Sequence, residues 1–282
     1  MDVTWVLKYI TEFIATAFLV LLGNGVVANV SLKGTKGNGQ GLTLVALGYG
    51  LGLMLPALMF GNVSGNHVNP AITIGLAVSG LFPWAHVAPY ILAQFLGAMF
   101  AQLVVVSMYA PFFKQTDDAN AILGSFAIIN NLDDNTVESR KAATRNGFIS
   151  EFIGSFVLFF GVLALTKNFF GAELVGKLVT AGYEQTVAET QVAPFVTGSL
   201  SVAHMAIGFL LMALIAGLGG PTGAGLNPAR DLGPRLVHHF LPKSVLGSAK
   251  GDSKWWYAWV GVVAPILAGV LAVALFKYLY LG

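Results

Sequence analysis

Residues 65–71 read GNHVNPA and residues 223–231 read GAGLNPARD, and these two stretches decide how the rest of the chain folds. In each stretch an Asn is followed directly by Pro. Asn is a preferred helix N-cap and Pro is preferred at the first helical position, so helices are predicted to begin at Pro70 and Pro228. Each stretch closely follows an apolar segment that is long enough to cross a bilayer. The two predicted helices therefore begin while the chain is still at or near the membrane.

The composition is that of a chain embedded in lipid. Of its 282 residues, 56% are hydrophobic and 10% are charged, which is more apolar than a soluble domain can bury in one core. A helix needs about 20 apolar residues to cross the hydrocarbon layer, whereas the strands of a β-barrel are ~10 residues long. Six stretches have the helical length: residues 5–29, 42–60, 84–111, 148–170, 195–218 and 255–280. We therefore predict an all-α membrane protein with six transmembrane helices.

The residue types exclude several kinds of chemistry. The chain has no cysteine, which excludes a disulfide framework, a thiolate nucleophile and a cysteine metal site. Its net charge of +2 and its lack of a basic run give no support to nucleic-acid binding. No HExxH, no GxSxG and no group of histidines and carboxylates at metal-ligand spacing is present. We therefore expect neither an enzyme nor a resident metal or cofactor.

The same order of motifs occurs twice along the chain. Glu12 lies near the start of the first apolar stretch and Glu151 near the start of the fourth, and an Ala-Pro pair lies inside both the third and the sixth. An ordinary helix start explains one Asn-Pro-Ala motif, but two in matching places of a duplicated chain indicate a repeat. We interpret residues 1–282 as one domain, with repeats at about 1–111 and 147–282 joined by a polar loop at about 112–146. Because each repeat has an odd number of spans, the second enters the membrane from the opposite side.

The helices predicted after the two motifs are too short to cross the bilayer. Residues 70–80 would span roughly 16 Å at 1.5 Å per residue, about half of the hydrocarbon layer, and residues 228–240 are similar. Non-helical backbone at this depth must be covered by protein or line a water-filled cavity. We therefore predict two re-entrant half-helices that enter from opposite faces and meet N-terminus to N-terminus beside a pore.

Two connecting segments have a recognisable composition. Residues 112–146 are rich in Asn and Asp without the spacing of a calcium-binding EF-hand, which favours a solvated loop. Residues 171–191 place apolar side chains on one helical face opposite Glu and Lys, which predicts an amphipathic segment in the membrane interface.

The paired motifs resemble those of the major intrinsic proteins, the aquaporin family, and within it the glycerol facilitators or aquaglyceroporins. The resemblance spans essentially the whole chain, and Asp231 after Arg230 resembles the glycerol-conducting branch. It implies the aquaporin fold and a passive channel for glycerol, water and other small neutral solutes that excludes ions and protons. It also implies a homotetramer with one pore per subunit, in the plasma membrane with both termini cytoplasmic.

The distribution of positive charges disagrees with that orientation. Cations are expected to be enriched on the cytoplasmic side, and this count would place the termini outside. We give precedence to the resemblance. The cations concerned are Lys33, Lys36, Arg140, Lys141 and Arg145 on one side, and Lys8 and Lys277 on the other.

The resemblance assigns roles to pore residues, and both asparagines of the motifs are expected to donate side-chain N–H groups to the solute. The pore motifs are Asn69, Pro70 and Ala71, and Asn227, Pro228 and Ala229. The selectivity ring falls on Tyr49, Ile215 or Ala216, Ala224 and Arg230. Tyr stands where the family usually has Trp, and Ala224 where it usually has Phe. We hypothesise a wider or more polar ring that also admits dihydroxyacetone, urea, hydrogen peroxide or undissociated lactic acid.

Elementary electrostatics supports a pore for neutral solutes. Two facing helix N-termini make the centre of the pore positive, and Arg230 adds a permanent charge that repels cations. Backbone carbonyls of the two loops would form a ladder of acceptors that replaces hydration water. The residues expected to provide them are Gly65, Asn66, His67, Val68, Ala224, Gly225 and Leu226.

The intramembrane carboxylates Glu12 and Glu151 have two interpretations. They could relay protons, or they could accept hydrogen bonds from backbone N–H groups of the half-helix loops, which is the structural role that the resemblance favours. Asp231, in the first turn of a predicted helix, is expected to anchor the second half-helix or its loop.

The histidines have different expected roles. His67 lies in the first pore loop, where a wall or gating role and plain packing are about equally supported. His204 is interpreted as an interior histidine rather than a ligand, and His238 and His239 as surface residues.

Two other functions remain as alternatives. An ion-coupled secondary transporter of small polyols also uses inverted repeats and broken helices, but it needs a coupling-ion site, for which only the two glutamates are available. An intramembrane hydrolase would need a nucleophile or metal constellation that the sequence lacks.

Overall fold

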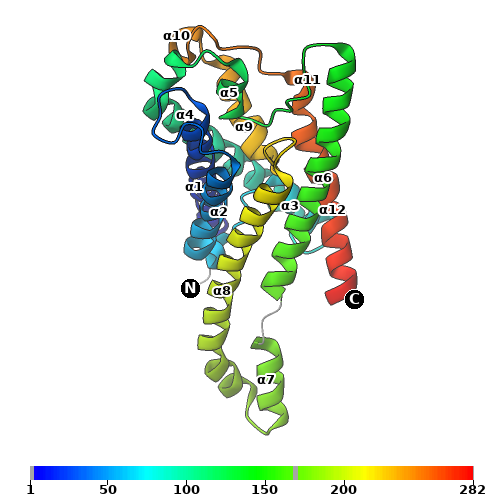
Figure 1. Cartoon of the computed structure of the whole chain (residues 1–282). Helices are drawn as coiled ribbons and strands as arrows, with labels where there is room; N and C mark the ends of the chain where they lie inside the picture. The colour runs from blue at the N-terminus through cyan, green and yellow to red at the C-terminus, as the bar shows by residue number, and fades with distance from the viewer. Residues whose placement is uncertain (1–2, 168–170, 282) are drawn as a thin grey trace.

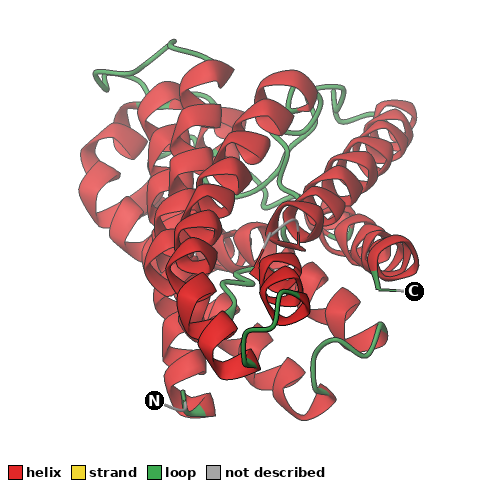
Figure 2. Cartoon of the chain, turned by 90° about the horizontal axis from the view of Figure 1, so that it is seen from below, coloured by secondary structure: helices red, strands yellow, loops and turns green. Residues whose placement is uncertain are grey.

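The computed structural model describes residues 3–167 and 171–281, and every regular element in these ranges is a helix (Figure 1). The first repeat contains α1 (Trp5–Ser31), α2 (Leu42–Ser64), α3 (Pro70–Val78), η1 (Trp84–His86) and α4 (Val87–Gln115). The connection contains α5 (Ala119–Gly124). The second repeat contains α6 (Val137–Lys167), α7 (Gly171–Thr180), α8 (Gln185–Leu218), α9 (Pro228–Phe240), α10 (Lys243–Leu246), α11 (Trp255–Ala258) and α12 (Val260–Tyr280). Figure 2 shows the same helices from below, joined by loops.

Six segments of the described chain are long and apolar enough to cross a membrane. They are Trp5–Ser31, Leu42–Ser64, Trp84–Gln115, Val137–Lys167, Gly198–Leu218 and Trp255–Tyr280. Each coincides with one of the six predicted stretches, so the prediction of a six-span all-α membrane protein is confirmed. The fourth spanning segment, α6, begins at Val137 and not near residue 148 as predicted. Its first turns are formed by residues of the polar region.

The helices pack as two similar sets, and the half-helix of each set packs against a spanning helix of the other. In the first set α1 packs against α2 and α4, and in the second α6 packs against α8 and α12. The half-helix α3 of the first set packs against α12 of the second, and the half-helix α9 of the second packs against α4 of the first. This reciprocal packing is the arrangement expected of an inverted repeat.

The contact between α3 and α12 brings two backbones together. A Cβ atom added to Gly75 would lie 2.7 Å from the carbonyl oxygen of Gly269, and one added to Gly269 would lie 2.6 Å from the carbonyl oxygen of Ala71. Small residues at such positions are what allow membrane helices to approach closely. Each of these two glycines is therefore required by the position of α3.

Substituting either glycine should displace the first half-helix. We expect Gly75→Ala and Gly269→Ala each to destabilise the protein by about 1–3 kcal/mol, because the added methyl group overpacks a contact between backbones. The midpoint of thermal denaturation in detergent would measure the loss. Gly217→Ala is the matched control, since nothing lies within 4 Å of a Cβ added there. Equal midpoints for all of these variants would contradict the assignment.

The connection between the repeats is only partly the solvated loop that its composition predicts. The α4 helix extends to Gln115, α5 covers Ala119–Gly124 and α6 begins at Val137, so more than half of residues 112–146 is helical. Between α4 and α6, the side chains of Ile122, Leu123 and Phe126 are completely or almost completely buried. The prediction was wrong for this stretch because the Asn and Asp residues around it hid a short apolar sequence that packs into the protein.

Residues 171–191 are not one interfacial helix. They comprise α7, a turn and the first residues of α8, and α7 packs against α8. Gly182 in the turn has φ +96°, a conformation that favours glycine and ends the helical path. In Figure 1, α7 and the first turns of α8 lie beyond the ends of the other helices, on the side of the two termini. The position of this segment at the membrane interface stays a prediction.

Candidate functional site

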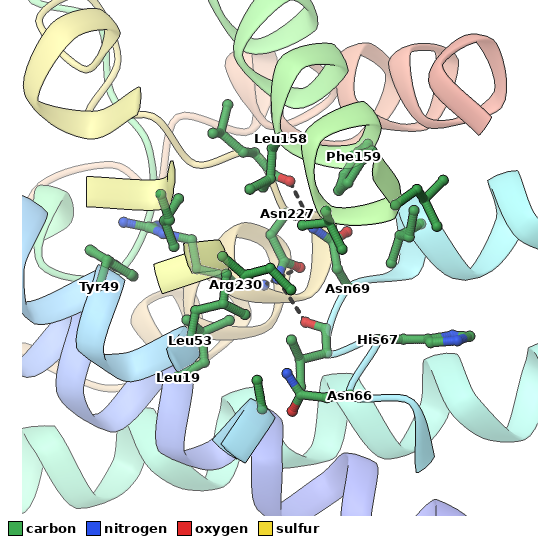
Figure 3. Close-up of a pocket in the computed structure, with 18 of the residues that line it drawn as sticks. Leu19, Tyr49, Leu53, Asn66, His67, Asn69, Leu158, Phe159, Asn227 and Arg230 are labelled. Carbon is green, nitrogen blue, oxygen red and sulfur yellow. Dashed lines mark hydrogen bonds between the residues drawn. The ribbon is translucent and has the colours of Figure 1, made fainter. Parts of the chain in front are cut away.

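The central cavity of the molecule has a volume of about 160 Å³ and is lined by both loops that precede the half-helices. Side chains of α1, α2, α3, α6 and α8 complete the wall, and most of them are apolar. Most of the polar groups come from the loops and from the first turn of α9, and Tyr49, Thr166 and His204 add three more from the helices. A narrow space with one polar side and one apolar side therefore runs past the meeting point of the half-helices (Figure 3).

The two loops have matching backbone conformations. Relative to the Asn of each motif, the residues four, three and one positions earlier have positive φ in both loops. The values are 85°, 49° and 44° for Gly65, Asn66 and Val68, and 85°, 51° and 52° for Gly223, Ala224 and Leu226. A left-handed valine is rare and costs free energy, so the surrounding contacts must hold this conformation.

Glu12 holds the first loop. Its Oε1 accepts hydrogen bonds from the hydroxyl of Ser64 (2.7 Å) and the backbone N–H of His67 (2.9 Å). Its Oε2 accepts from the backbone N–H of Val68 (2.8 Å) and from Nε2 of Gln94 (2.8 Å). The carboxylate is fully buried and accepts from donors that lipid could not satisfy.

Glu151 holds the second loop in the same way. Its Oε1 accepts from the hydroxyl of Thr222 (2.6 Å) and the backbone N–H of Gly225 (3.0 Å), and its Oε2 accepts from the backbone N–H of Leu226 (2.7 Å). This carboxylate is also fully buried. The two glutamates are therefore equivalent in the two repeats.

Sequence reasoning missed the two hydroxyl residues in these networks. Ser64 accepts from the backbone N–H of Asn66 and Thr222 from that of Ala224, both at 3.1 Å, while each donates to its glutamate. The signal was present, because each hydroxyl residue stands five positions before the Asn of its motif. The positions match between repeats even though the residue types differ.

The direction of the carbonyl groups follows from these hydrogen bonds. The N–H groups of Asn66, His67 and Val68 point into the protein, toward Ser64 and Glu12. A trans peptide is planar, so the carbonyl of the preceding residue points the opposite way. The free acceptors of the first loop are therefore the carbonyls of Gly65, Asn66 and His67. The corresponding carbonyls of the second loop are those of Gly223, Ala224 and Gly225.

The two asparagines join the half-helices head to head. Asn69 Oδ1 accepts from the N–H of Ala71 (3.0 Å), and Asn227 Oδ1 accepts from those of Ala229 (3.0 Å) and Arg230 (3.2 Å), so both are N-caps. Pro70 and Pro228 occupy the first helical positions.

Each asparagine also bonds to the opposite loop. The amide nitrogen of Asn69 donates to the carbonyl of Leu226 (2.8 Å), and that of Asn227 donates to the carbonyl of Val68 (2.7 Å) (Figure 3). These two carbonyls, which the sequence suggested for the acceptor ladder, are thus already engaged. An amide nitrogen carries two protons, so each asparagine keeps one for a solute in the cavity that both line.

Arg230 places a fixed charge in the cavity. Its guanidinium carbon lies 4.9 Å from the centre of the Tyr49 ring, and Nη1 is 3.5 Å from the carbonyl of Phe126. Its Nε is buried and has no hydrogen-bond partner among the described residues. Ile215 and Ala224 also line the cavity, whereas Ala216 is exposed on another face.

A buried network that the sequence did not reveal orients Tyr49. The Tyr49 hydroxyl donates to Oδ1 of Asn24, and the amide nitrogen of Asn24 donates to Gln102 Oε1 (2.6 Å) and to the carbonyl of Phe126 (3.1 Å). These residues come from α1, α2, α4 and the connection between the repeats. The hydroxyl is thereby held within the helix bundle, which leaves the face of the ring to Arg230.

Asp231 anchors more than its own helix. It accepts from the backbone N–H of Ile128 (2.6 Å) and forms a buried ion pair with Arg235 (2.9 Å). Arg235 in turn donates to the carbonyls of Ile128 (2.8 Å) and Ser253 (2.7 Å). This network fastens α9 to the connection between the repeats and to the segment before α11.

The histidines differ from one another in their surroundings. The His67 ring contacts Thr73 (3.1 Å) and points away from Asn69, so its side chain packs behind the loop (Figure 3). His204 is buried and also lines the cavity, which makes it part of the wall. The prediction of a surface position was wrong for His238, which is fully buried and bonds to Ser253 (2.8 Å). It lies four residues after Pro234, on the face of α9 that packs inward. His239 is exposed as predicted.

The fold defines a class of protein: a multi-pass membrane protein with two re-entrant half-helices around a central cavity. Over residues 2–176 and 168–276 the sequence matches the family model described as Major intrinsic protein. The chain belongs to this family, whose members are channels and facilitators and not enzymes.

Individual relatives agree with this assignment. The chain is 57% identical over 290 residues to "Glycerol facilitator-aquaporin gla" of Lactococcus lactis subsp. cremoris, with 100% of both chains covered. It is 44% identical over 283 residues to "Glycerol uptake facilitator protein-like 5" of Lactiplantibacillus plantarum, with 98% of each covered. The fold is similar to that of the aquaglyceroporin from Plasmodium falciparum, with a TM-score of 0.68, 23% identity and coverage of 97% and 96%. The predicted aquaporin fold is confirmed.

Proposed function

We propose that this protein is a passive channel for glycerol, water and other small neutral solutes, and that it excludes ions and protons. The observation that carries the proposal is the paired arrangement of the two loops. Each loop turns its N–H groups onto a buried glutamate and its carbonyls toward one cavity, where the two half-helices meet at their N-termini. The relatives named glycerol facilitators support the choice of solute.

The proposed conduction path replaces the hydration of a polyol step by step. Hydroxyl groups of the solute donate to successive loop carbonyls and accept from Asn69, Asn227 and Arg230, while its carbon atoms slide along the apolar wall. A cation meets the positive ends of α3 and α9 and the charge of Arg230, and these interactions oppose its entry. Neutral solutes meet a low barrier along this path and move down their own concentration gradient, so no other energy source is needed.

The position of the glutamates argues against an ion-coupled transporter. Neither Glu12 nor Glu151 lines the cavity, and the oxygens of both are occupied by hydrogen bonds from the protein. No group of three or more His, Asp or Glu side chains suited to hold a metal ion occurs within residues 3–167 and 171–281. A passive channel therefore fits the described residues better.

Stopped-flow swelling of proteoliposomes tests the channel directly. Vesicles that contain the protein should take up glycerol much faster than empty vesicles. The rate should stay the same when ionophores collapse all ion gradients, because a channel uses none. Uptake that stops under ionophores would instead support the transporter.

We further propose that Tyr49, Ile215, Ala224 and Arg230 form the selectivity ring. All four line the cavity, Arg230 lies against the Tyr49 ring, and Ala224 has a small side chain where a larger one would restrict the solute. The wider opening would admit dihydroxyacetone, urea, hydrogen peroxide or undissociated lactic acid beside glycerol.

Filling that gap should narrow the range of solutes. In Ala224→Phe we expect uptake of the bulkier solutes to fall by roughly tenfold while water permeation persists, because a difference of ~1.4 kcal/mol in a narrow passage corresponds to that factor. The measurement is a solute panel in vesicles with matched protein content. Ala216→Phe is the control, since Ala216 lies on another face. Unchanged selectivity in Ala224→Phe would exclude the ring assignment.

The assembly and orientation belong to the same proposal. We place the protein in the plasma membrane as a homotetramer with one pore per subunit and with both termini cytoplasmic. The support is its membership of the family, together with the six apolar spans, which put the termini on one side.

A further inference from the structure

A second concave region lies outside the pore. It is a surface groove of about 640 Å³ between the first turns of α6 and the start of the last span, and it shares no lining residue with the central cavity. Its polar wall carries the cations Arg140, Lys141 and Arg145, and no acidic side chain lines it. The groove is therefore positively charged.

Two of the three cations are free to bind a ligand. Arg140 is engaged, because it lies 3.5 Å from Asp133 and its guanidinium carbon is 5.1 Å from the centre of the Trp256 ring. Burial acts to raise the pKa of Asp133, but the hydrogen bond from Lys254 and the charges of Lys254 and Arg140 outweigh it and hold that pKa below its usual range. Asp133 is thus ionised and neutralises part of this charge. Among the described residues, Lys141 and Arg145 form no ion pair with Asp or Glu.

The other wall of the groove is apolar and aromatic. The ring centres of Phe148 and Trp259 are 5.8 Å apart. Ile149 also lines the groove, and 48% of its surface is exposed. Lys141, Arg145 and Ile149 follow one another at intervals of four residues, so they lie on one face of α6. The groove therefore changes from cationic to apolar in the direction in which α6 enters the membrane.

This gradient coincides with the membrane boundary. Both spans that border the groove begin here, at the end of the bundle opposite the termini (Figure 1). Trp side chains are enriched at the level of lipid headgroups, and Trp256 and Trp259 lie at that level if the spans are centred in the bilayer. The cations would then lie beside headgroup phosphates and Ile149 beside acyl chains.

We propose that this groove binds an anionic glycerophospholipid, with the phosphate between Lys141 and Arg145 and an acyl chain along Phe148, Ile149 and Trp259. Charge complementarity selects the anionic headgroup, and the apolar wall selects a molecule with a tail over a soluble anion. The same cations belong to the set that makes the charge distribution disagree with the expected orientation. Lipid binding gives them a role that is independent of orientation.

Native mass spectrometry of the full-length protein tests the proposal by counting bound lipids. The probes are phosphatidylglycerol and phosphatidylcholine with identical acyl chains. One cation near a headgroup contributes about fivefold in affinity, so we expect the wild type to prefer phosphatidylglycerol by roughly 25-fold. Lys141→Gln with Arg145→Gln should remove that preference, and Lys141→Arg with Arg145→Lys should retain it.

The matched control removes the same number of positive charges at the same end of the molecule. Lys33→Gln with Lys36→Gln should keep the lipid preference, because both residues lie in the loop between α1 and α2 and do not line the groove. Glycerol uptake equal to that of the wild type would verify that each variant is folded.

Four results would overturn the proposal. The first is equal affinity of the wild type for both lipids. The second is an equal loss of the preference for phosphatidylglycerol in the groove variant and in the control. The third is displacement of the lipid by soluble glycerol 3-phosphate at similar concentration, which would indicate a site for a free anion. The fourth is a change of oligomeric mass in the groove variant, which would indicate that a second copy of the chain covers this face.

Discussion

Glu12→Gln is expected to remove most of the folded protein, and Glu151→Gln to remove less. Glutamine keeps one acceptor oxygen and replaces the other by an NH₂ donor. Each oxygen of Glu12 accepts two hydrogen bonds, so glutamine leaves two buried donors without an acceptor. Oε2 of Glu151 accepts one, so glutamine there leaves only one. At about 1–3 kcal/mol for each unsatisfied donor, the losses are about 2–6 and 1–3 kcal/mol.

The fraction of monodisperse protein on size exclusion and the thermal midpoint in detergent would measure both losses. Glu189→Gln makes the same chemical change at an exposed position of α8 and should leave both values unaltered. If Glu12→Gln yields normal amounts of folded protein that has lost only proton-dependent uptake, the carboxylate is a relay and the structural interpretation is wrong.

Arg230→Val should open the pore to protons. At a separation of about 6 Å and an effective dielectric constant near 20, the interaction of two unit charges amounts to roughly 2–3 kcal/mol. Removing it should raise the proton permeability by roughly 30- to 150-fold. The structure allows this change without collapse, since Arg230 contributes one long hydrogen bond and one ring contact to the fold.

Proton permeability can be followed with a pH-sensitive dye trapped in proteoliposomes. Arg230→Lys retains the charge and loses the planar set of donors, so it should still exclude protons while conducting glycerol more slowly. Proton exclusion that is the same in Arg230→Val and the wild type would assign the barrier to the half-helices alone.

Features that depend on local sequence were predictable. The six spans follow from apolar length, and the starts of α3 and α9 follow from Asn-Pro, because capping and proline geometry act within a few residues. That Glu12 and Glu151 accept hydrogen bonds from the half-helix loops was expected from the resemblance and from the cost of unsatisfied N–H groups in lipid.

Features that depend on tertiary contacts were not predictable. The Asn24 amide joins residues of three separate segments, and no spacing along the chain indicates that it orients Tyr49. Likewise, nothing local shows that Phe126 is buried or that His238 faces Ser253, because a polar stretch and a helix end usually meet solvent. The choice between Ile215 and Ala216 depended on the length of the next loop, which only the backbone geometry defines.

The exchange of half-helices between the repeats has a consequence for biosynthesis. The α3 segment is synthesised long before α12, the helix against which it packs in the finished protein. The side-chain amide of its N-cap, Asn69, likewise donates to the carbonyl of Leu226, which is synthesised much later. A nascent chain that ends before α12 therefore has an incomplete re-entrant turn. Translation must run almost to the C-terminus before α3 can pack against α12, so late truncations should be as damaging as early ones. An ancestor with one repeat would have needed a second molecule to reach the same state.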